Sequence, residues 1–238
     1  GRSLLRLKAS SSSSDPGGPS EIEFDIKTAI ALVGGQSLIV LAAVIVAYFV
    51  KTPLLGLGNG FVFDSVEAWK YGVAATVPLG VLAVVLDGFE ESVPALKKVT
   101  KATQRSVLTL LGGRFLPLTG FLTATALGIA AGVGEEWLFR GVMQTELVER
   151  VFTQANVAPA VVFSSLIFGA LHAVTPLYAI LATLASLYFG FLYIWTDNLA
   201  IPMICHAVYD IGALYYAHWT VAKDLTLEQR NDLLRMPL

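Results

Sequence analysis

The spacing of the charged residues constrains this chain more than any other feature. From Thr28 to Val50 there are 23 consecutive residues without Asp, Glu, Lys or Arg, and from Val151 to Thr196 there are 46. Because an α-helix rises about 1.5 Å per residue, the first stretch alone can cross a bilayer core of about 30 Å. The chain is therefore expected to span a membrane more than once.

The composition supports the same conclusion. Of the 238 residues, 55% are hydrophobic and 14% are charged, and the mean hydropathy is +0.67, which is unusual for a soluble domain. We expect an all-α fold, a polytopic bundle of about six to seven transmembrane helices. The expected spans are Thr28–Val50, Tyr71–Leu86 with a kink at Pro78, Phe115–Gly134, two helices divided by Pro159 and Pro176 within 151–196, and the middle of Asn198–Ala222.

Charge and cysteine content exclude several classes of protein. The formal net charge is −2, so the chain has no basic surplus with which to bind the phosphates of nucleic acid. A single cysteine, Cys205, makes neither an internal disulfide nor a thiolate cluster for zinc. We therefore expect no nucleic-acid partner and no structural metal or disulfide.

Composition also divides the chain into four parts. Residues 1–27 form a leader, 28–114 hold N-terminal membrane helices and an interfacial segment, 115–218 form a membrane core, and 219–238 form a polar C-terminal tail. The leader contains basic residues and a run of five serines, with no acidic residue before Asp15. This pattern is typical of an organelle transit-peptide remnant, and an ordinary flexible terminus is the alternative. We expect a plastid membrane, either thylakoid or inner envelope.

The segment Glu91–Leu111, between the second and third spans, mixes basic and apolar residues. The pattern favours an amphipathic helix at the membrane interface, with a solvated loop as the alternative. Its basic residues are Lys97, Lys98, Lys101 and Arg105, and Arg114 follows closely. These five are part of only sixteen basic residues, so the positive-inside rule predicts that this segment faces the cytosol or stroma.

Ionisable residues at membrane depth are costly, so they usually face the interior of a bundle and mark a function or a paired network. Here they fall in three short segments. The segments are Glu135-Glu136 with Arg140, Phe168 with His172, and His206 with Asp210. Each has a structural alternative: a solvated helix turn, an interhelical hydrogen bond and a structural pair, respectively. His218 is expected at the interface, near the end of the last span.

Helical geometry suggests how these residues pair. Glu136 and Arg140 are four positions apart, which favours an intrahelical ion pair. Glu135 points about 100° away, which leaves its carboxylate free to act. In the same way Asp210 can accept a proton from His206 and set its tautomer, and Phe168 can pack beside His172.

In combination, the three segments resemble the CAAX protease and bacteriocin-processing family, also called Abi proteins. The family pattern is EExxxR, then FxxxH, then His followed four residues later by Asn or Asp. This chain has these motifs in order, over roughly Phe115–Ala217. Asp210 stands where the better-studied prenyl proteases of the family have Asn.

The resemblance implies a glutamate-type intramembrane protease without a metal or other cofactor. In such an enzyme Glu135 is the general base that activates a water. His172 and His206 stabilise the oxyanion and orient the water, and Asp210 holds His206. Glu136, Arg140 and Phe168 have supporting roles. The substrate is expected to be a membrane protein or peptide in the lipid bilayer, with membrane-complex partners as a further possibility.

Two alternatives stay open. Two glutamates, two histidines and one aspartate could assemble a metal site, although neither HExxH nor ExxH occurs. The polar cluster could also hold together a non-proteolytic membrane scaffold or regulator, because a fold does not guarantee an activity. A nucleophilic mechanism has less support, because the chain has no GxSxG.

Overall fold

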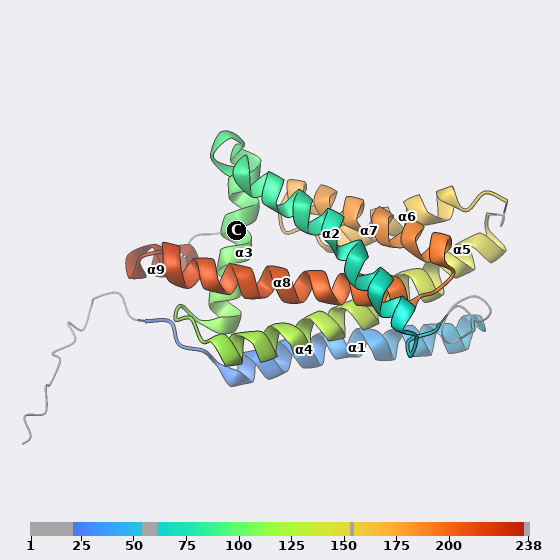
Figure 1. Cartoon of the computed structure of the whole chain (residues 1–238), viewed down its shortest axis with the longest axis horizontal. Coiled ribbons are helices and arrows are strands. Elements are labelled where there is room, and N and C mark those ends of the chain that lie inside the picture. Colours follow the sequence, from blue (N-terminus) through green and yellow to red (C-terminus); the bar gives the residue numbers. More distant parts are fainter. Residues whose placement is uncertain (1–20, 54–60, 153–154, 236–238) are drawn as a thin grey trace, which may run out of the picture.

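A computed structural model describes residues 21–53, 61–152 and 155–235, and every regular element in these ranges is a helix (Figure 1). The α-helices are α1 (Ile26–Val50), α2 (Val66–Gly88), α3 (Pro94–Leu111), α4 (Pro117–Glu136), α5 (Thr145–Arg150), α6 (Ala158–Leu171), α7 (Pro176–Thr196), α8 (Ala200–Asp224) and α9 (Leu227–Arg235). A 3-10 turn, η1 (Glu90–Ser92), precedes α3, and a π-helix, η2 (Trp137–Gln144), joins α4 to α5. The all-α class is confirmed. Most of the predicted leader, residues 1–20, lies outside the described residues.

Four helices in the described part of the chain are long and apolar enough to cross a membrane. They are α1, α2, α7 and the continuous helix Pro117–Arg150 of 34 residues. Helix α6 has 14 residues, about 21 Å of helix, which is shorter than a bilayer core. Helix α8 has 25 residues but is more polar, since it carries His206, Asp210 and His218. A polytopic membrane protein is therefore confirmed, and the count of six to seven spans stays a prediction.

The third span is longer than predicted. It was expected to end at Gly134, but helical structure continues without a break through η2 and α5. The reason is that Glu136 and Arg140 are fully buried and paired with each other. Because the two opposite charges neutralise each other inside the bundle, the helix can continue past them without exposing them to water.

Helix α8 is the centre of the bundle, in contact with α2, α3, α4 and α7, while α1 runs along the outer side of α4 (Figure 1). Two glycines on α4 allow the closest approach. A Cβ atom on Gly132 would lie 2.7 Å from the backbone nitrogen of Ala207, and one on Gly128 would lie 2.9 Å from the Ala207 oxygen. Small residues four apart let membrane helices pack with their backbones close together. This contact brings the acidic end of α4 against His206 of α8.

Helices α1 and α2 leave long rows of apolar side chains uncovered. The exposed residues include Ile30, Leu38, Leu41, Val77 and Val84. Apolar surface of this extent suits contact with lipid.

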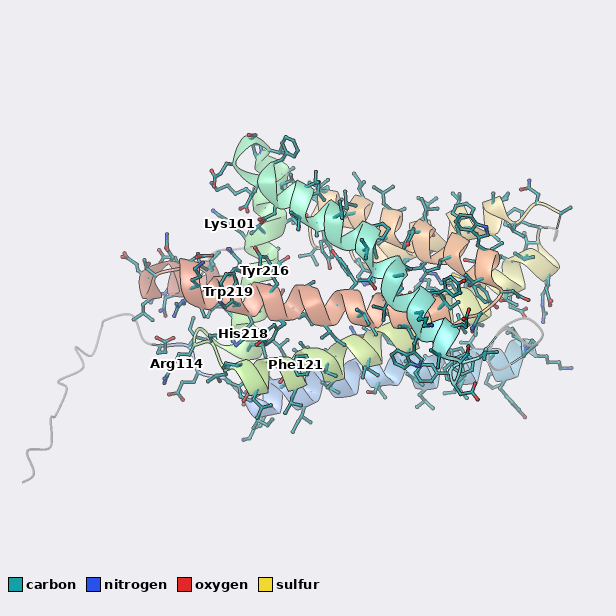
Figure 2. All side chains as sticks on the ribbon, in the orientation of Figure 1. Lys101, Arg114, Phe121, Tyr216, His218 and Trp219 are labelled. Atoms are coloured by element: carbon teal, nitrogen blue, oxygen red, sulfur yellow. The ribbon has the colours of Figure 1, made fainter. Side chains whose placement is uncertain are left out.

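Helix α3 is the amphipathic helix predicted for this segment, and it runs across one end of the long helices (Figure 1). It buries Leu96, Val107 and Leu108 while Lys98 stays exposed. Figure 2 shows Lys101 at this end of the molecule, together with Arg114, Tyr216 and Trp219. Tryptophan, tyrosine and basic residues gathered at one level are typical of a membrane interface.

The structure adds detail near the C-terminus. His218 is fully buried within the protein, and its Nε2 atom accepts a hydrogen bond of 3.1 Å from the Leu116 backbone N–H. It therefore stabilises the start of α4, because a first-turn N–H has no partner within its own helix. In the segment predicted as a polar C-terminal tail, α8 continues to Asp224 and α9 follows it.

Candidate active site

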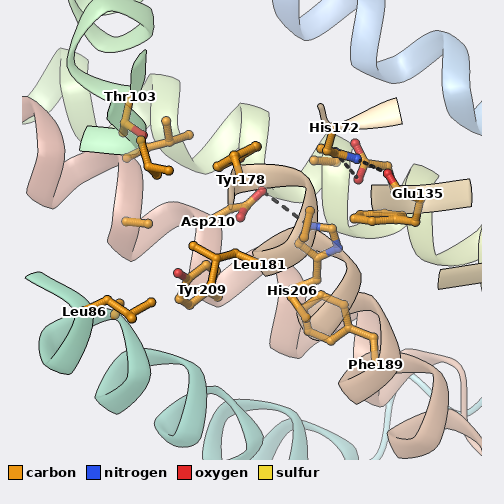
Figure 3. A pocket seen from close by; sticks show the side chains of 18 of the residues that line it. Leu86, Thr103, Glu135, His172, Tyr178, Leu181, Phe189, His206, Tyr209 and Asp210 are labelled. Atoms are coloured by element: carbon orange, nitrogen blue, oxygen red, sulfur yellow. Dashed lines mark hydrogen bonds and ion pairs between the residues drawn. The ribbon is translucent and has the colours of Figure 1, made fainter. Parts of the chain in front are cut away.

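A cavity of about 480 Å³ lies between α2, α3, α7 and α8 (Figure 3). Glu135, His172, His206 and Asp210 all line it. They come from α4, from the residue that ends α6, and from α8. The structure thus brings together the four residues that sequence reasoning singled out from three separate segments.

Glu135 points into this cavity. Its side chain is 7% exposed, and its Oε2 atom lies 3.6 Å from Nε2 of His172, a separation longer than a hydrogen bond. The Nδ1 atom of His172 is 2.8 Å from the Phe168 backbone oxygen. A carbonyl oxygen only accepts, so Nδ1 carries the proton and donates it there. Nε2 is left facing Glu135, and the carboxylate has room for a further partner.

Glu136 points the opposite way, into the protein. Its Oε1 atom accepts a hydrogen bond of 3.1 Å from Nη1 of Arg140 and one of 2.8 Å from Nδ1 of His206. The pairing with Arg140 confirms the prediction from helical spacing. The contact with His206 was missed, because the two residues are 70 positions apart.

His206 has a second carboxylate partner besides the predicted Asp210. The sequence suggested that Asp210 holds this imidazole, yet Oδ2 of Asp210 lies 3.5 Å from Nε2 while Glu136 lies 2.8 Å from Nδ1. The shorter and more buried contact orients the ring. Asp210, with 30% of its side chain exposed, instead faces Nε2 from the cavity.

Arg140 is fully buried, and both of its terminal nitrogens have hydrogen-bond partners. Its Nη2 atom donates hydrogen bonds of 2.7 Å to both the backbone oxygen and the hydroxyl of Ser186. Its guanidinium carbon lies 5.2 Å from the centre of the Phe168 ring and 5.5 Å from that of Phe189. Cation–π contacts of this length stabilise a buried guanidinium.

The same two phenyl rings also support the histidines. Phe168 stacks on His172 with ring centres 4.2 Å apart, as predicted, and Phe189 stacks on His206 at 4.8 Å. Ser186 and Phe189 were both missed. They lie in α7, where a serine and a phenylalanine in a long apolar run carry no signal of a site.

Comparison with known protein families agrees with this geometry. Residues 117–212 match the family described as Rce1-like, type II CAAX prenyl endopeptidase. The matched range includes all three motifs. This part of the chain is therefore similar to that family. Comparison with curated proteins and with solved structures gave no match.

Within the matched range, the first motif runs into a π-helix rather than an α-helix. The wider turn is visible where the Thr145 hydroxyl donates to the Arg140 backbone oxygen five residues earlier, at 3.0 Å. Short π-helical segments are frequent at functional sites. The predicted pair of Glu136 and Arg140 forms at the junction of the two helix types.

A metal site needs at least three donor side chains that converge on one point. Among the described residues, no group of three His, Cys, Asp or Glu side chains is arranged to hold an ion. Figure 3 shows two separate pairs instead, Asp210 beside His206 and His172 beside Glu135. What the arrangement does offer is one cavity-facing carboxylate beside two imidazoles.

Proposed function

We propose that this integral membrane protein is an intramembrane endopeptidase in which Glu135 activates a water molecule. One observation carries the proposal: of two adjacent glutamates, Glu136 is held by Arg140 and His206, whereas Glu135 faces a cavity with two histidines and an aspartate. A general base needs this combination of a fixed position and access to a reacting water.

In the proposed reaction, Glu135 removes a proton from the water as its oxygen attacks the carbonyl carbon of the peptide bond. His172 and His206 each act as an imidazolium to stabilise the oxyanion that forms, because Nδ1 already donates to the Phe168 carbonyl or to Glu136 and Nε2, on the cavity side, must also carry a proton. The carbon–nitrogen bond then breaks, and the leaving amine takes the proton from Glu135. Asp210 favours a protonated Nε2 on His206, as this role requires. No covalent intermediate with the protein is formed.

The supporting residues hold this geometry. Glu136 and Arg140 fix the helix end that carries Glu135, and Phe168 holds the His172 ring in place by stacking. Since Arg140 contacts both Phe168 and Phe189, a single buried cation connects the supports of the two histidines.

The proposed substrate is a membrane protein or peptide that reaches the cavity within or beside the bilayer. The proposed location is a plastid membrane, thylakoid or inner envelope. This location rests on the basic, serine-rich and acid-poor composition of residues 1–20.

The experiment compares the membrane proteomes of cells that express the wild type, Glu135→Gln or Glu149→Gln in place of the native protein. The amide is nearly isosteric with the acid but accepts no proton, so Glu135→Gln should fold and abolish the protein termini produced by cleavage. Glu149 lies exposed on α5 of the same continuous helix and is the matched control. Equal sets of termini in all three strains would overturn the proposal.

The two alternatives predict different results in the same strains. If the protein works as a scaffold, Glu135→Gln rescues every phenotype of a null mutant. If a metal supplies the hydroxide, chelators abolish the wild-type termini and added zinc restores them. The general-base proposal requires that chelators have little effect.

A further inference from the structure

The charges that line the cavity are strongly unequal. Three carboxylates line it: Asp87 from the end of α2, Glu135 from α4 and Asp210 from α8. Among the described residues that line the cavity there are two histidines but no lysine or arginine. Even with both imidazoles protonated, three ionised carboxylates leave the lining negative.

Two basic side chains near this lining are already paired with acidic residues. Arg140 lies behind the site, fully buried against Glu136 and Ser186. On α3, Lys97 pairs with Glu91 at 3.1 Å. This helix lines the cavity with other residues, namely Leu96, Val99, Thr100 and Thr103.

Glu135 adds an independent observation that the cavity is built for a ligand. More than nine tenths of its side chain is buried, yet its nearest charged partner, His172, lies at 3.6 Å, beyond hydrogen-bond distance. A buried carboxylate without a close hydrogen bond retains a strong field, because little water screens it. That field extends into a cavity whose other walls are largely apolar.

Asp87 lies at the opening of this cavity, since it is both exposed and part of the lining. It stands at the C-terminal end of α2, where the helix dipole is also negative. An incoming segment therefore meets negative charge at the opening and again at Asp210 and Glu135.

We infer that the segment bound in this cavity carries a positive charge, a lysine or arginine side chain, close to the bond that is cleaved, and that Asp87 determines this specificity. The inference rests on the proposed function and names its substrate class. A free C-terminal carboxylate beside the bond is disfavoured by the same field. Preferred sites lie inside a chain and next to a basic residue.

The test uses peptides of one apolar sequence in which Lys, Gln or Glu occupies each position in turn. Binding is measured with the full wild-type chain in phosphatidylcholine nanodiscs, so that Glu135 keeps its charge, and the peptides are N-methylated along the backbone so that they are not consumed. At the best position, the Lys peptide should bind about threefold to fivefold more tightly than the Glu peptide at low salt. Adding Asp87→Asn should bring this ratio close to one. Adding Asp64→Asn, at the other end of α2, should leave it unchanged.

A second series compares peptides with a free C-terminal carboxylate and with an amide, and the amide should bind more tightly. Equal binding of Lys and Glu peptides at every position, an equal effect of Asp64→Asn, or no binding of any peptide would overturn the inference. Cleavage of the unmethylated peptides by the wild-type chain separates the two proposals. A Lys preference in binding without cleavage that depends on Glu135 would refute only the proposed function. Cleavage that depends on Glu135 without any charge preference would refute only this inference.

Discussion

Glu135 and Glu136 are adjacent in the sequence but lie in opposite environments. Glu136 is fully buried and accepts two hydrogen bonds of 2.8 and 3.1 Å. Glu135 faces the cavity, and its nearest charged partner is 3.6 Å away. One carboxylate is used for structure, and the other is left available for chemistry.

The same division extends to the partners of each glutamate. On the buried side, Arg140 holds Ser186 at 2.7 Å, and on the cavity side Asp210 and His206 are 3.5 Å apart. His206 belongs to both sides, with Nδ1 toward Glu136 and Nε2 toward the cavity. The close contact of Nδ1 with Glu136 therefore fixes the His206 ring, while Nε2 keeps its orientation and can still bind a further partner. An active site requires this combination.

The largest effect is expected when the buried side loses its cation. Arg140→Ala leaves Glu136 charged and buried without its ion-pair partner, which should reduce the free energy of unfolding by about 3–5 kcal/mol. Folded yield in detergent and unfolding in a denaturant titration measure this loss. Normal yield with normal activity would show that the buried pair is unimportant.

A direct comparison of the two glutamates should give the next largest effect. Glu136→Gln weakens two buried charged hydrogen bonds and should cost about 2–3 kcal/mol of stability. Glu135→Gln should leave stability nearly unchanged while reducing peptide hydrolysis by about 10²–10⁴-fold. Thermal unfolding and a cleavage assay on both variants check this. Equal loss of stability in the two variants would abolish the distinction between the two sides.

The features of this site that lie within a single helix were predictable from the sequence. A spacing of four residues was enough to pair Glu136 with Arg140, and charges in apolar segments were enough to select Glu135 and His172. The all-helical fold followed from charge-free lengths alone. These features depend on one helix at a time.

What could not be predicted depends on contacts between helices. The contact of His206 with Glu136 and that of Arg140 with Ser186 require knowledge of which faces meet. The buried position of His218 was missed for the same reason, since position along a helix says nothing about the face that is covered. The π-helix also escaped, because no residue type marks its wider turn.

The close packing of α4 against α8 holds Glu136 beside His206. The importance of this packing can be tested at Gly132. A Cβ atom there would lie 2.7 Å from a backbone nitrogen and 2.8 Å from a backbone oxygen of α8. Gly132→Ala should therefore cost about 1–3 kcal/mol by overpacking and should also reduce activity. The matched control is Gly35→Ala in α1, where the added methyl meets nothing within 4 Å. That variant should be neutral or slightly stabilising, and equal effects at the two positions would exclude close packing as the cause.

Asp25 is an exposed carboxylate that accepts two hydrogen bonds. It therefore serves as a control that separates the effect of burial on Glu135 and Glu136 from the effect of hydrogen bonding. It precedes α1 and accepts from the Thr28 hydroxyl at 2.7 Å and from the Lys27 backbone N–H at 3.0 Å. These bonds, the hydroxyl first, lower the pKa of Asp25 below its usual value. A lowered pKa in the folded state means that this stabilisation is complete above the usual pKa of aspartate and is lost as the pH falls through the folded-state value.

The smallest effect is therefore expected for Asp25→Ala. Loss of the helix cap should lower the unfolding temperature slightly at neutral pH, and the difference from the wild type should vanish in acid, once the pH lies below the lowered folded-state pKa of Asp25. Thermal unfolding at several pH values measures it. A loss as large as that of Glu136→Gln would mean that burial is not what gives Glu136 its structural role. A small loss would assign the difference between these carboxylates to their environments rather than to the number of hydrogen bonds, since each accepts two.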